Sequence, residues 1–473
     1  MRLLYYTNEL DIVGLVYGSS VHHWQGDGEH TLKQAKELGL ITSFKGETAG
    51  SPARSDDAKT WRWEPLGWME EKVTEDYNQV YPNLVKHDPN YPSPAELWSK
   101  IAVGNTKWEN DFHEDTPGSN LIKNALLDAD QRPLYLEAWG GTNTIARALK
   151  SIEQQYKGTA DWATIQAKVN KKAVIATIGQ QDNAYNDYIS KSWPGVKVLD
   201  LGTVFGGFTS FAKDNAPAAI KPYYQASFWA TNIKYGHGAV LDHYGLIGDG
   251  TYIAGEGNNL GWQPGQAKDL STWKMFNSRG GYQRLDWTSE GDSPSFMFLV
   301  PTGLRGVQDP SLGGWGGRLN PSTTPGYYSG VADLNPNTNK SDGTYSIARF
   351  MPAIGNDFAA RADWGITDRY SDANHAPKVS VPSVSLQGRP GQTVQLRVDA
   401  SDPDRDALKT EWSVYTEAST VTGTPTLSGN RSTATIKIPA SATPGQRIVV
   451  IAAVSDSGTP SLTRYGQIVV TVK

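Results

Sequence analysis

The hydrophobic pattern of this chain changes once, near residue 365, and this change restricts the possible folds more than any other feature. Before it, short apolar runs typical of buried strands alternate with segments of helical periodicity, which predicts βαβ units and a mostly parallel sheet. From residue 378 onward, six segments alternate apolar and polar residues between Gly, Pro and Asp turns, as in an immunoglobulin-like β-sandwich. We therefore expect an α/β domain over residues 1–365, a linker over 366–377 and an all-β domain over 378–473.

Individual segments of the first part have clear strand or helix character. The run LDIVGLVYG at 10–18 is rich in β-branched residues, as expected for a strand buried on both faces. A helix is expected over 142–156, where Thr142 or Asn143 can serve as the N-cap. Further strands are expected within 132–141, 171–183 and 196–202, and a late strand or helix start within 293–301.

The binding site is expected at one edge of the sheet, because ligands of parallel α/β sheets bind beyond the carboxyl ends of the strands. Two glycines and a helix start follow the strand at 132–141, an arrangement that lets a ligand approach the backbone closely. A well-made turn without a ligand is the alternative. The side chains at these strand ends are Ser19, Ser20, Glu137, Trp139, Gln181, Asp182 and Asn183.

The composition excludes several classes of function. Lys and Arg number 44 against 49 Asp and Glu, a net charge of −5, so no nucleic acid partner is expected. No apolar run reaches the length of a membrane span, and no signal peptide is visible. Cysteine is absent, which excludes disulfides, thiolate metal sites and a cysteine nucleophile. The 16 Trp and 22 Tyr residues either stack on sugar rings or fill a large core.

Two short motifs contain residues able to do chemistry. In SSVHHWQG (19–26), His22 and His23 can act as acid–base groups or sugar partners beside Trp24, or the segment is a surface loop with a packed Trp. In WTSEGDSPSF (287–296), Glu290 and Asp292 precede an apolar run. Asp292 either caps that element or offers an oxygen to a hard cation.

A third acidic motif lies in the C-terminal part. In SDPDRDAL (401–408), Asp402, Asp404 and Asp406 occupy alternate positions, which suits either a calcium site or an ordinary Asp-Pro turn. The usual signatures of serine hydrolases, P-loop enzymes, zinc proteases and dinucleotide-binding proteins are absent from the sequence.

Together, long stretches of the chain resemble one family, the bacterial and fungal cellulose-binding proteins with a nucleoside-hydrolase-like domain followed by an Ig-like domain. The resemblance is carried by LYYTNELDIVGLVYGSSVHHWQG, by EDTPGSNLIKNALLDADQRPLYLEAWGGTNTIARALKSIEQQY and by EGDSPSFMFLVPTGL. NHAPKV, SDPDRDALKTEWSVYTEA and GTPSLTRYGQIVV are similar to the family's C-terminal module. The resemblance to this family implies a nucleoside-hydrolase-like α/β fold and a secreted or periplasmic location.

The resemblance also implies a calcium site in the first domain. The backbone carbonyl near Ala138 and the carboxylate of Asp292 correspond to metal ligands, and Ser19 and Ser20 stand where a Gly-Asn turn of the family approaches the sugar. The family's first strand and its Asp-rich loop, which supply most carboxylates and the general base, are expected directly upstream of Met1. The chain is thus expected to begin inside its first helix, to hold Ca²⁺ weakly and to leave its catalytic residues unassigned.

The expected function is binding of cellulose or another plant polysaccharide, with or without hydrolysis of a glycosyl bond. The expected ligand-binding residues are Ser19, Ser20, His22, His23, Trp24, Glu137, Trp139, Thr142, Asn143, Asp182, Asn183 and Glu290. Two alternatives stay open: a calcium-dependent nucleoside (N-glycosyl) hydrolase and a non-catalytic polysaccharide-binding protein. The resemblance also shows one departure in the C-terminal module, where Arg405 replaces the usual Gly of its turn.

Overall fold

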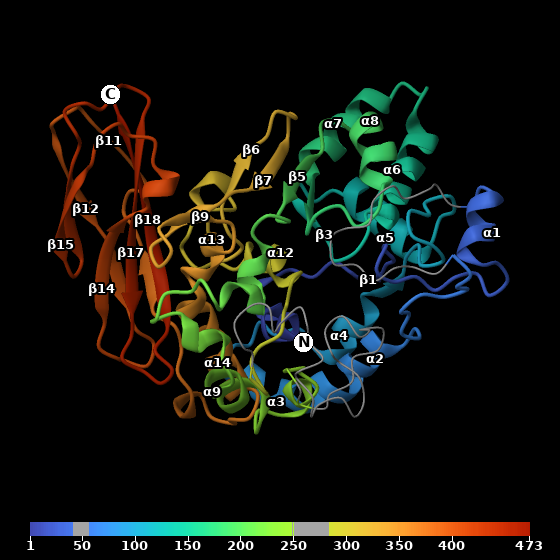
Figure 1. The fold of residues 1–473 in the computed structure, drawn as a ribbon, viewed down its shortest axis with the longest axis horizontal. Coiled ribbons are helices and arrows are strands. Elements are labelled where there is room, and N and C mark those ends of the chain that lie inside the picture. The colour runs from blue at the N-terminus through green and yellow to red at the C-terminus, as the bar shows by residue number, and fades with distance from the viewer. Residues whose placement is uncertain (41–55, 248, 250–282) are drawn as a thin grey trace.

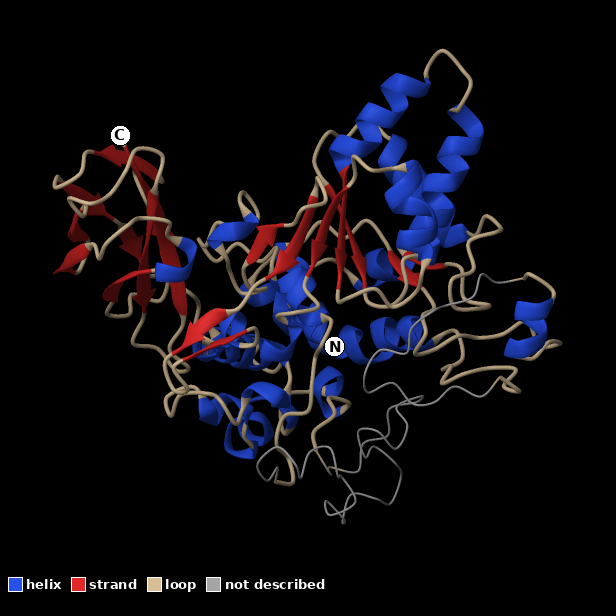
Figure 2. Cartoon of the chain, turned by 45° about the horizontal axis from the view of Figure 1, so that its top comes forward, coloured by secondary structure: helices blue, strands red, loops and turns tan. Residues whose placement is uncertain are grey.

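The computed structural model of the chain describes residues 1–40, 56–247, 249 and 283–473. A larger N-terminal region has helices around a central sheet, and a C-terminal region consists mostly of strands (Figure 1). Figure 2 shows the C-terminal strands gathered at one end of the molecule, beside the helices and the central sheet. This arrangement confirms the predicted fold class, whereas the exact domain boundaries at 365 and 378 remain predictions.

The central sheet contains five strands in the order β3–β4–β5–β7–β6. The first four run parallel and β6 is antiparallel to β7. Thr177 pairs with Ala138 on one side and with Asp200 on the other, so the carboxyl ends of three strands lie level. The strands are β3 (Leu134–Ala138), β4 (Ala173–Thr177), β5 (Lys197–Asp200), β6 (Leu319–Pro321) and β7 (Tyr327–Gly330).

The predicted strand at 10–18 is much shorter in the structure. Only β1 (Leu15–Tyr17) forms, paired in parallel with β2 (Ile101–Val103) in a separate two-stranded sheet. Val13 is 44% exposed, so this run is not buried on both faces. Residues 10–12 line a pocket with polar neighbours instead of continuing the strand. The short hairpin of β8 (Asp333–Asn335) and β9 (Lys340–Asp342) completes the strands of this region.

Helices surround the central sheet, and the one expected at 142–156 is present as α6. The segment at 293–301 begins as a helix, α12, and the chain starts with a 3₁₀ turn at Arg2–Tyr5. No helix of the described residues has both the length and the apolar character to cross a membrane. The helices are α1 (Leu32–Glu37), α2 (Trp68–Glu71), α3 (Asn78–His87), α4 (Pro94–Ser99), α5 (Pro117–Leu127), α6 (Asn143–Tyr156), α7 (Trp162–Lys172), α8 (Ser190–Ser192), α9 (Ala226–Trp229), α10 (Ala239–Asp242), α12 (Ser293–Met297), α13 (Tyr345–Ala348) and α14 (Met351–Trp364).

The C-terminal region forms a four-stranded sheet, β11–β18–β17–β14, a three-stranded sheet, β12–β16–β15, and the pair β10–β13. This arrangement is consistent with a sandwich. Residues 378–473 are fully described and contain nine strands instead of six, because two expected strands are each split and β15 was not anticipated. The strands are β10 (Lys378–Ser380), β11 (Ser385–Gly388), β12 (Thr393–Arg397), β13 (Asp399–Ser401), β14 (Lys409–Val414), β15 (Thr426–Asn430), β16 (Thr433–Lys437), β17 (Arg447–Ser455) and β18 (Thr463–Val472).

Strand β17 is buried on both of its faces. Ile448 and Val450 belong to the core between the C-terminal sheets, whereas Val449 and Ile451 belong to the large core of the N-terminal region. Successive side chains of a strand point to opposite faces, so one strand can serve two cores. The two regions therefore share a continuous apolar interior.

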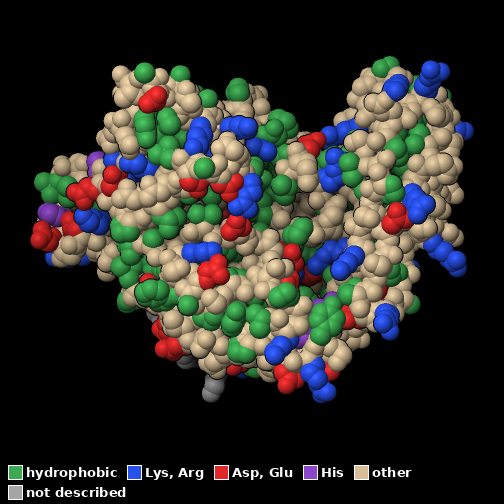
Figure 3. Space-filling model, turned by 180° about the vertical axis from the view of Figure 1, so that it is seen from behind, with side chains coloured by type: hydrophobic (Ala, Val, Ile, Leu, Met, Phe, Trp, Pro, Cys, Tyr) green, Lys and Arg blue, Asp and Glu red, His purple; other side chains and the backbone are tan. Residues whose placement is uncertain are grey.

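On the face shown in Figure 3, Lys and Arg side chains are interspersed with Asp and Glu side chains.

Candidate functional site

The carboxyl ends of β1 and β3 meet at a tight turn built from two glycines. The amide of Gly141 donates to the carbonyl of Ser19 at 2.9 Å. A Cβ atom on Gly141 would lie 2.2 Å from Oδ2 of Asp182 and 2.7 Å from the Ser19 carbonyl, so a larger residue does not fit. Around Gly140 the nearest atom to such a Cβ is 3.4 Å away, which is ordinary contact distance. Gly141 is thus the position that the close packing requires.

Asn143 and Ser19 form a fully buried polar network beneath this turn. Nδ2 of Asn143 donates to Oγ of Ser19 at 3.0 Å and to the carbonyls of Asn105 and Asp111 at 2.9 and 3.0 Å. The Ser19 hydroxyl lies 2.9 Å from the carbonyls of Asn105 and Trp108. These two predicted ligand contacts therefore hold loops together in this structure, and no ligand reaches them without rearrangement.

Asp182 supplies the N-terminal cap of α6, which corrects the expectation that Thr142 or Asn143 does so. Thr142 occupies the N-cap position, but its side chain makes no capping hydrogen bond. Oδ2 of Asp182 accepts from the backbone N–H of Asn143 at 2.9 Å. Oδ1 accepts from the Thr142 hydroxyl at 3.0 Å and from the N–H of Ala184 at 3.0 Å. Burial raises the pKa of Asp182 to about 6, although these hydrogen bonds oppose the shift. Nothing in the local sequence of α6 points to a cap from the loop after β4.

Trp139 is the exposed member of the predicted set. Its side chain is 40% exposed, and its Nε1 donates to Oγ of Ser295 in α12 at 2.8 Å. The Ser295 hydroxyl in turn donates to the carbonyl of Asp292 at 2.8 Å. The indole ring also contacts the Phe296 ring, with 6.0 Å between the centroids. The ring is thus held in one orientation while part of it faces solvent.

Glu137 is the second-last residue of β3 and lies two residues before Trp139, which follows the strand. Both carboxylate oxygens are buried, and neither has a hydrogen-bond partner in the part of the chain that the structure describes. Burial raises the pKa of Glu137 to about 7, and the neighbouring Ser295 hydroxyl offsets this only in part. Glu137 is therefore the carboxyl group of this edge that is least committed to structural contacts.

Glu290 is neutralised by an arginine close to the N-terminus. Its carboxylate accepts from Nε and Nη2 of Arg2 at 2.5 and 2.9 Å, and from the hydroxyls of Ser293 and Tyr244. Burial raises the pKa of Glu290, but the charge of Arg2 outweighs it and the pKa lies below its ordinary value. The guanidinium of Arg2 also stacks on the Phe358 ring at 4.0 Å. In this structure Glu290 is an ion-pair partner.

The loop after β1 places its two histidines and its tryptophan differently. Ser20 and His23 exchange backbone hydrogen bonds at 2.8 and 3.1 Å, and the His22 amide donates to the Ser20 hydroxyl at 3.0 Å. His23 lies beside Gly140, stacks on Trp63 at 6.4 Å, and burial lowers its pKa to about 4. Trp24 is fully buried against Trp108, with 4.9 Å between the ring centroids. Of the two alternatives for this segment, the packed tryptophan is the one found, and the Trp24 ring cannot contact a ligand here.

Asn183, the last of the expected ligand contacts, lies in the loop after β4. Its carbonyl accepts from the N–H of Asp187 at 2.7 Å, and this hydrogen bond starts the next helical turn. The structure thus brings Ser19, Trp139, Thr142, Asn143 and Asp182 together at one edge, whereas Glu290 and Trp24 serve packing.

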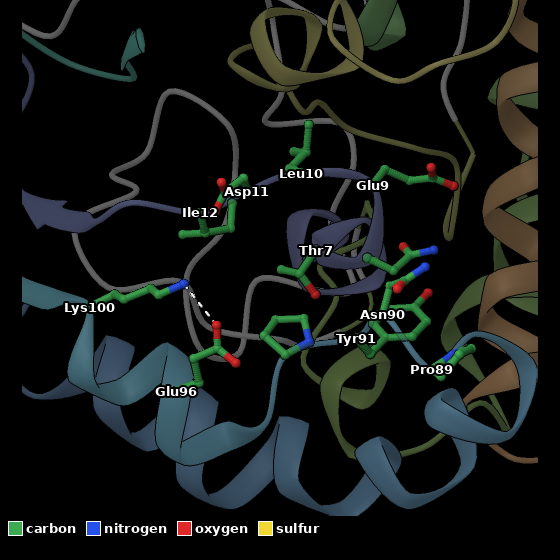
Figure 4. A pocket seen from close by; sticks show the side chains of 12 residues that line it. Thr7, Glu9, Leu10, Asp11, Ile12, Pro89, Asn90, Tyr91, Glu96 and Lys100 are labelled. Carbon is green, nitrogen blue, oxygen red and sulfur yellow. Dashed lines mark hydrogen bonds and ion pairs between the residues drawn. The ribbon is translucent and has the colours of Figure 1, made fainter. Parts of the chain in front are cut away.

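A pocket at the opposite, amino end of β1 was not anticipated from the sequence. It encloses about 440 Å³ (Figure 4). Figure 4 shows the Lys100 ammonium pointing to Glu96, at 3.0 Å. Because its polar residues are scattered along the chain, no motif marks it. The lining consists of Thr7, Asn8, Glu9, Leu10, Asp11, Ile12, Pro89, Asn90, Tyr91, Pro92, Glu96 and Lys100.

Comparison with known protein families shows which family this chain belongs to. Residues 1–319 match the family described as cellulose-binding Sde182, nucleoside hydrolase-like domain. The chain belongs to this family. Residues 393–472 match a second family described as the C-terminal domain of the cellulose-binding protein Sde0182. The resemblance expected from the sequence is confirmed.

Solved structures show the fold of this Sde182-family chain. A nucleoside hydrolase-related hypothetical protein from Saccharophagus degradans, associated with carbohydrate metabolism, aligns with a TM-score of 0.66 at 24% identity. The alignment covers 100% of this chain and 95% of that chain. Titin domain M7 aligns at 14% identity over 21% of this chain and 99% of that chain. Its TM-score of 0.15 is too low to indicate a shared fold. No curated protein matches this chain.

The calcium site implied for the nucleoside-hydrolase-like domain does not fit the residues described at this edge. Asp292 occupies the N-cap position of α12 without a side-chain cap, and Ala138 lies buried at the end of β3. In the described ranges, the one group of three or more His, Asp or Glu side chains close enough to share an ion is Asp402, Asp404 and Asp406, in the C-terminal region. A tight calcium site gathers several charged oxygens. Asp292 is a single carboxylate, so we still predict that Asp292 and the Ala138 carbonyl hold Ca²⁺ only weakly.

Proposed function

We propose that this member of the Sde182 family binds a polysaccharide of the cellulose class, with the Trp139 ring as the surface on which a pyranose stacks. The observation that supports it is the combination of exposure and fixed orientation at Trp139: 40% of the side chain is exposed while its Nε1 is held by Ser295. An aromatic ring offers an apolar face to the C–H face of a sugar, and its polar N–H is satisfied separately. Because cellulose lies outside cells, the proposal includes secretion or a periplasmic location.

The neighbours of Trp139 make this surface rigid before a ligand arrives. Gly141 is wedged between Asp182 and Ser19, and the buried network of Asn143 anchors the turn from below. A ring that is already ordered loses little conformational entropy on binding, which favours affinity. His23 beside Gly140 extends the surface toward Trp63. We propose that the polysaccharide chain runs along these rings.

Hydrolysis of a glycosyl bond is the second candidate, and the buried, unpartnered carboxyl of Glu137 is the observation that favours it. Glycoside hydrolysis ordinarily uses a pair of carboxyl groups. At this edge Glu290 is neutralised by Arg2 and Asp182 caps α6, so both are committed to structural contacts. The geometry therefore supports binding without turnover over glycosyl hydrolysis and over a calcium-dependent nucleoside hydrolase.

The test compares two exposed tryptophans. Trp139→Ala is expected to lower the affinity for insoluble cellulose and soluble β-glucans at least tenfold, about 1.4 kcal/mol. Trp98→Ala in α4, where the native ring is 52% exposed, is the matched control and should leave affinity unchanged. Pull-down on cellulose and titration calorimetry with soluble oligosaccharides supply the measurement. Trp139→Ala should also cost less stability than the roughly 3–5 kcal/mol of a core tryptophan. Equal affinities of the wild type and Trp139→Ala would contradict the proposal.

A further inference from the structure

Three carboxylates converge in the loop between β13 and β14, far from the edge described above. Asp402, Asp404 and Asp406 each place one oxygen within 4.8 Å of the others. The turn itself uses only one oxygen: Oδ1 of Asp402 accepts from the N–H groups of Asp404 and Asp406 at 2.9 and 3.0 Å. Oδ2 of Asp402 is buried and has no hydrogen-bond partner among the described residues. The turn geometry thus leaves part of the cluster unexplained.

A fourth carboxylate, Asp456 at the end of β17, supplies independent evidence for a ligand. Its side chain is only 6% exposed. All three of its hydrogen bonds go to Oδ1, from Asn374 Nδ2 at 3.2 Å and from the N–H groups of Gly458 and Leu462 at 3.1 and 2.9 Å. Oδ2 is buried and, within the described part of the chain, has no partner. A buried polar oxygen without a partner costs free energy.

Several contacts place Asp456 against the loop cluster. Asn374 donates to Asp456, and the next residue, His375, donates its N–H to Oδ2 of Asp404 at 2.7 Å. The hydroxyl of Ser457 lies 3.3 Å from Oδ1 of Asp406. The four carboxylates therefore share one neighbourhood.

The charge of this neighbourhood is poorly balanced by protein groups. Over the residues that the structure describes, Asp402, Asp406 and Asp456 form no ion pair with Lys or Arg, and only the His375 ring faces Asp404, at 3.1 Å. Carboxylates this close repel one another unless a cation lies between them. Carboxylate oxygens from two irregular loops suit Ca²⁺, which accepts varied geometry, better than Mg²⁺, which requires a near-ideal octahedron.

We infer that Asp402, Asp404 and Asp406 together bind one Ca²⁺ ion, with the buried carboxylate of Asp456 beside the site. The ion lies where the segment 366–377 joins the C-terminal strands, because His375 hydrogen-bonds directly to Asp404 and Asn374 hydrogen-bonds to the adjacent Asp456. His375 stacks on Tyr370 at 3.6 Å and on His87 of α3 at 5.2 Å, so this segment is anchored on the N-terminal region as well. Bound Ca²⁺ thus fastens the junction between the two regions.

The experiment titrates Ca²⁺ into the full-length chain by calorimetry and follows thermal unfolding with and without the ion. We expect a dissociation constant on the order of 10⁻⁴ M and an unfolding midpoint raised by a few degrees. Asp406→Asn is the main variant, because its carboxylate is partly exposed and its loss does not disturb the core. It and Asp402→Asn, which keeps an oxygen for the turn, should each weaken Ca²⁺ binding at least tenfold and abolish the thermal shift.

Two controls separate this site from others. Asp399→Asn removes a nearby exposed carboxylate that pairs with Arg397, and should bind Ca²⁺ like the wild type. Asp292→Asn tests the N-terminal edge and should also leave this binding unchanged. The inference is overturned if no Ca²⁺ binds up to about 10 mM, if Asp402→Asn and Asp406→Asn bind like the wild type, or if Asp292→Asn alone removes binding. Mg²⁺ binding as tightly as Ca²⁺ would overturn the assignment to calcium.

Discussion

Arg464 of β18 and Asp357 of α14 form a largely buried ion pair across the junction of the two regions, with 2.7 Å between Nη1 and Oδ2. The other oxygen of Asp357 accepts from the Tyr6 hydroxyl at 2.8 Å and from Nε of Arg361 at 2.9 Å. A single carboxylate thus connects the N-terminal turn, α14 and the C-terminal sheet. Breaking such a pair from one side leaves uncompensated buried charge.

This ion pair predicts acid sensitivity. Burial alone would raise the pKa of Asp357, but the charges of Arg464 and Arg361 hold it at about 2, below its ordinary value of 3.8. A depressed carboxyl pKa stabilises the folded state above the unfolded pKa, and this contribution is lost as pH falls from about 4 toward 2. We expect a loss of about 2 kcal/mol over that interval.

The measurement is urea unfolding of the wild type and of Asp357→Asn between about pH 2 and pH 7. The variant should be less stable near neutrality, by about 3–5 kcal/mol, and should lose less stability on acidification. Asp399→Asn, an exposed carboxylate variant, should follow the wild-type profile. Parallel profiles for the wild type and Asp357→Asn would show that this carboxylate does not control the acid response.

A second prediction concerns the independence of the C-terminal region. A fragment of residues 366–473 should unfold cooperatively, because its own core of residues such as Ile436 and Val450 lies between two sheets. It should be less stable than in the full chain, because Tyr415, Val449 and Tyr465 lose their packing against the N-terminal region. The fragment includes Asn374 and His375, which hydrogen-bond to its loops. Circular dichroism melting tests this, and the absence of a cooperative transition would mean that the boundary is wrong.

The two glycines after β3 should respond differently to the same substitution. Gly141→Ala forces a Cβ to within 2.2 Å of Asp182 and 2.7 Å of the Ser19 carbonyl, and we expect a loss of about 2–3 kcal/mol. Gly140→Ala meets its nearest atom at 3.4 Å and should cost less than about 1 kcal/mol. Urea unfolding of both variants supplies the comparison. Equal losses would mean that the turn relaxes more easily than its packing indicates.

Arg405 occupies a left-handed backbone conformation, with φ of +69°. This is the turn position where the resemblance suggested that Gly is usual. Arg405→Gly removes the steric cost of that conformation, about 1 kcal/mol, but increases the entropy of the unfolded chain by a smaller amount. We expect a net stabilisation of about 0.5 kcal/mol in urea unfolding. Arg397→Gly, within strand β12, serves as the control and should destabilise, so a loss in both variants would contradict the explanation.

The local sequence predicted those features that depend on neighbours along the chain. The strands within 132–141, 171–183 and 196–202 and the helix α6 follow from apolar periodicity, which records burial residue by residue. Strand β17 departs from the apolar–polar alternation expected of this region, because its unbroken apolar run is buried on both faces. Strand β15, TLSGN, was missed because it contains a single apolar residue and therefore has no periodic signal.

The tertiary structure decided which of the candidate site residues face solvent. Trp24 and Trp139 both follow a strand end, yet one is fully buried and the other is 40% exposed, because only packing from distant segments distinguishes them. Glu290 is paired with Arg2 across 288 positions, and Asp182 caps a helix that begins 39 residues earlier. Ser457, next to Asp456, likewise donates to Asp406, which lies 51 residues earlier in the chain. Periodicity reports the burial of a residue within its own element, whereas a partner's identity depends on how the elements pack.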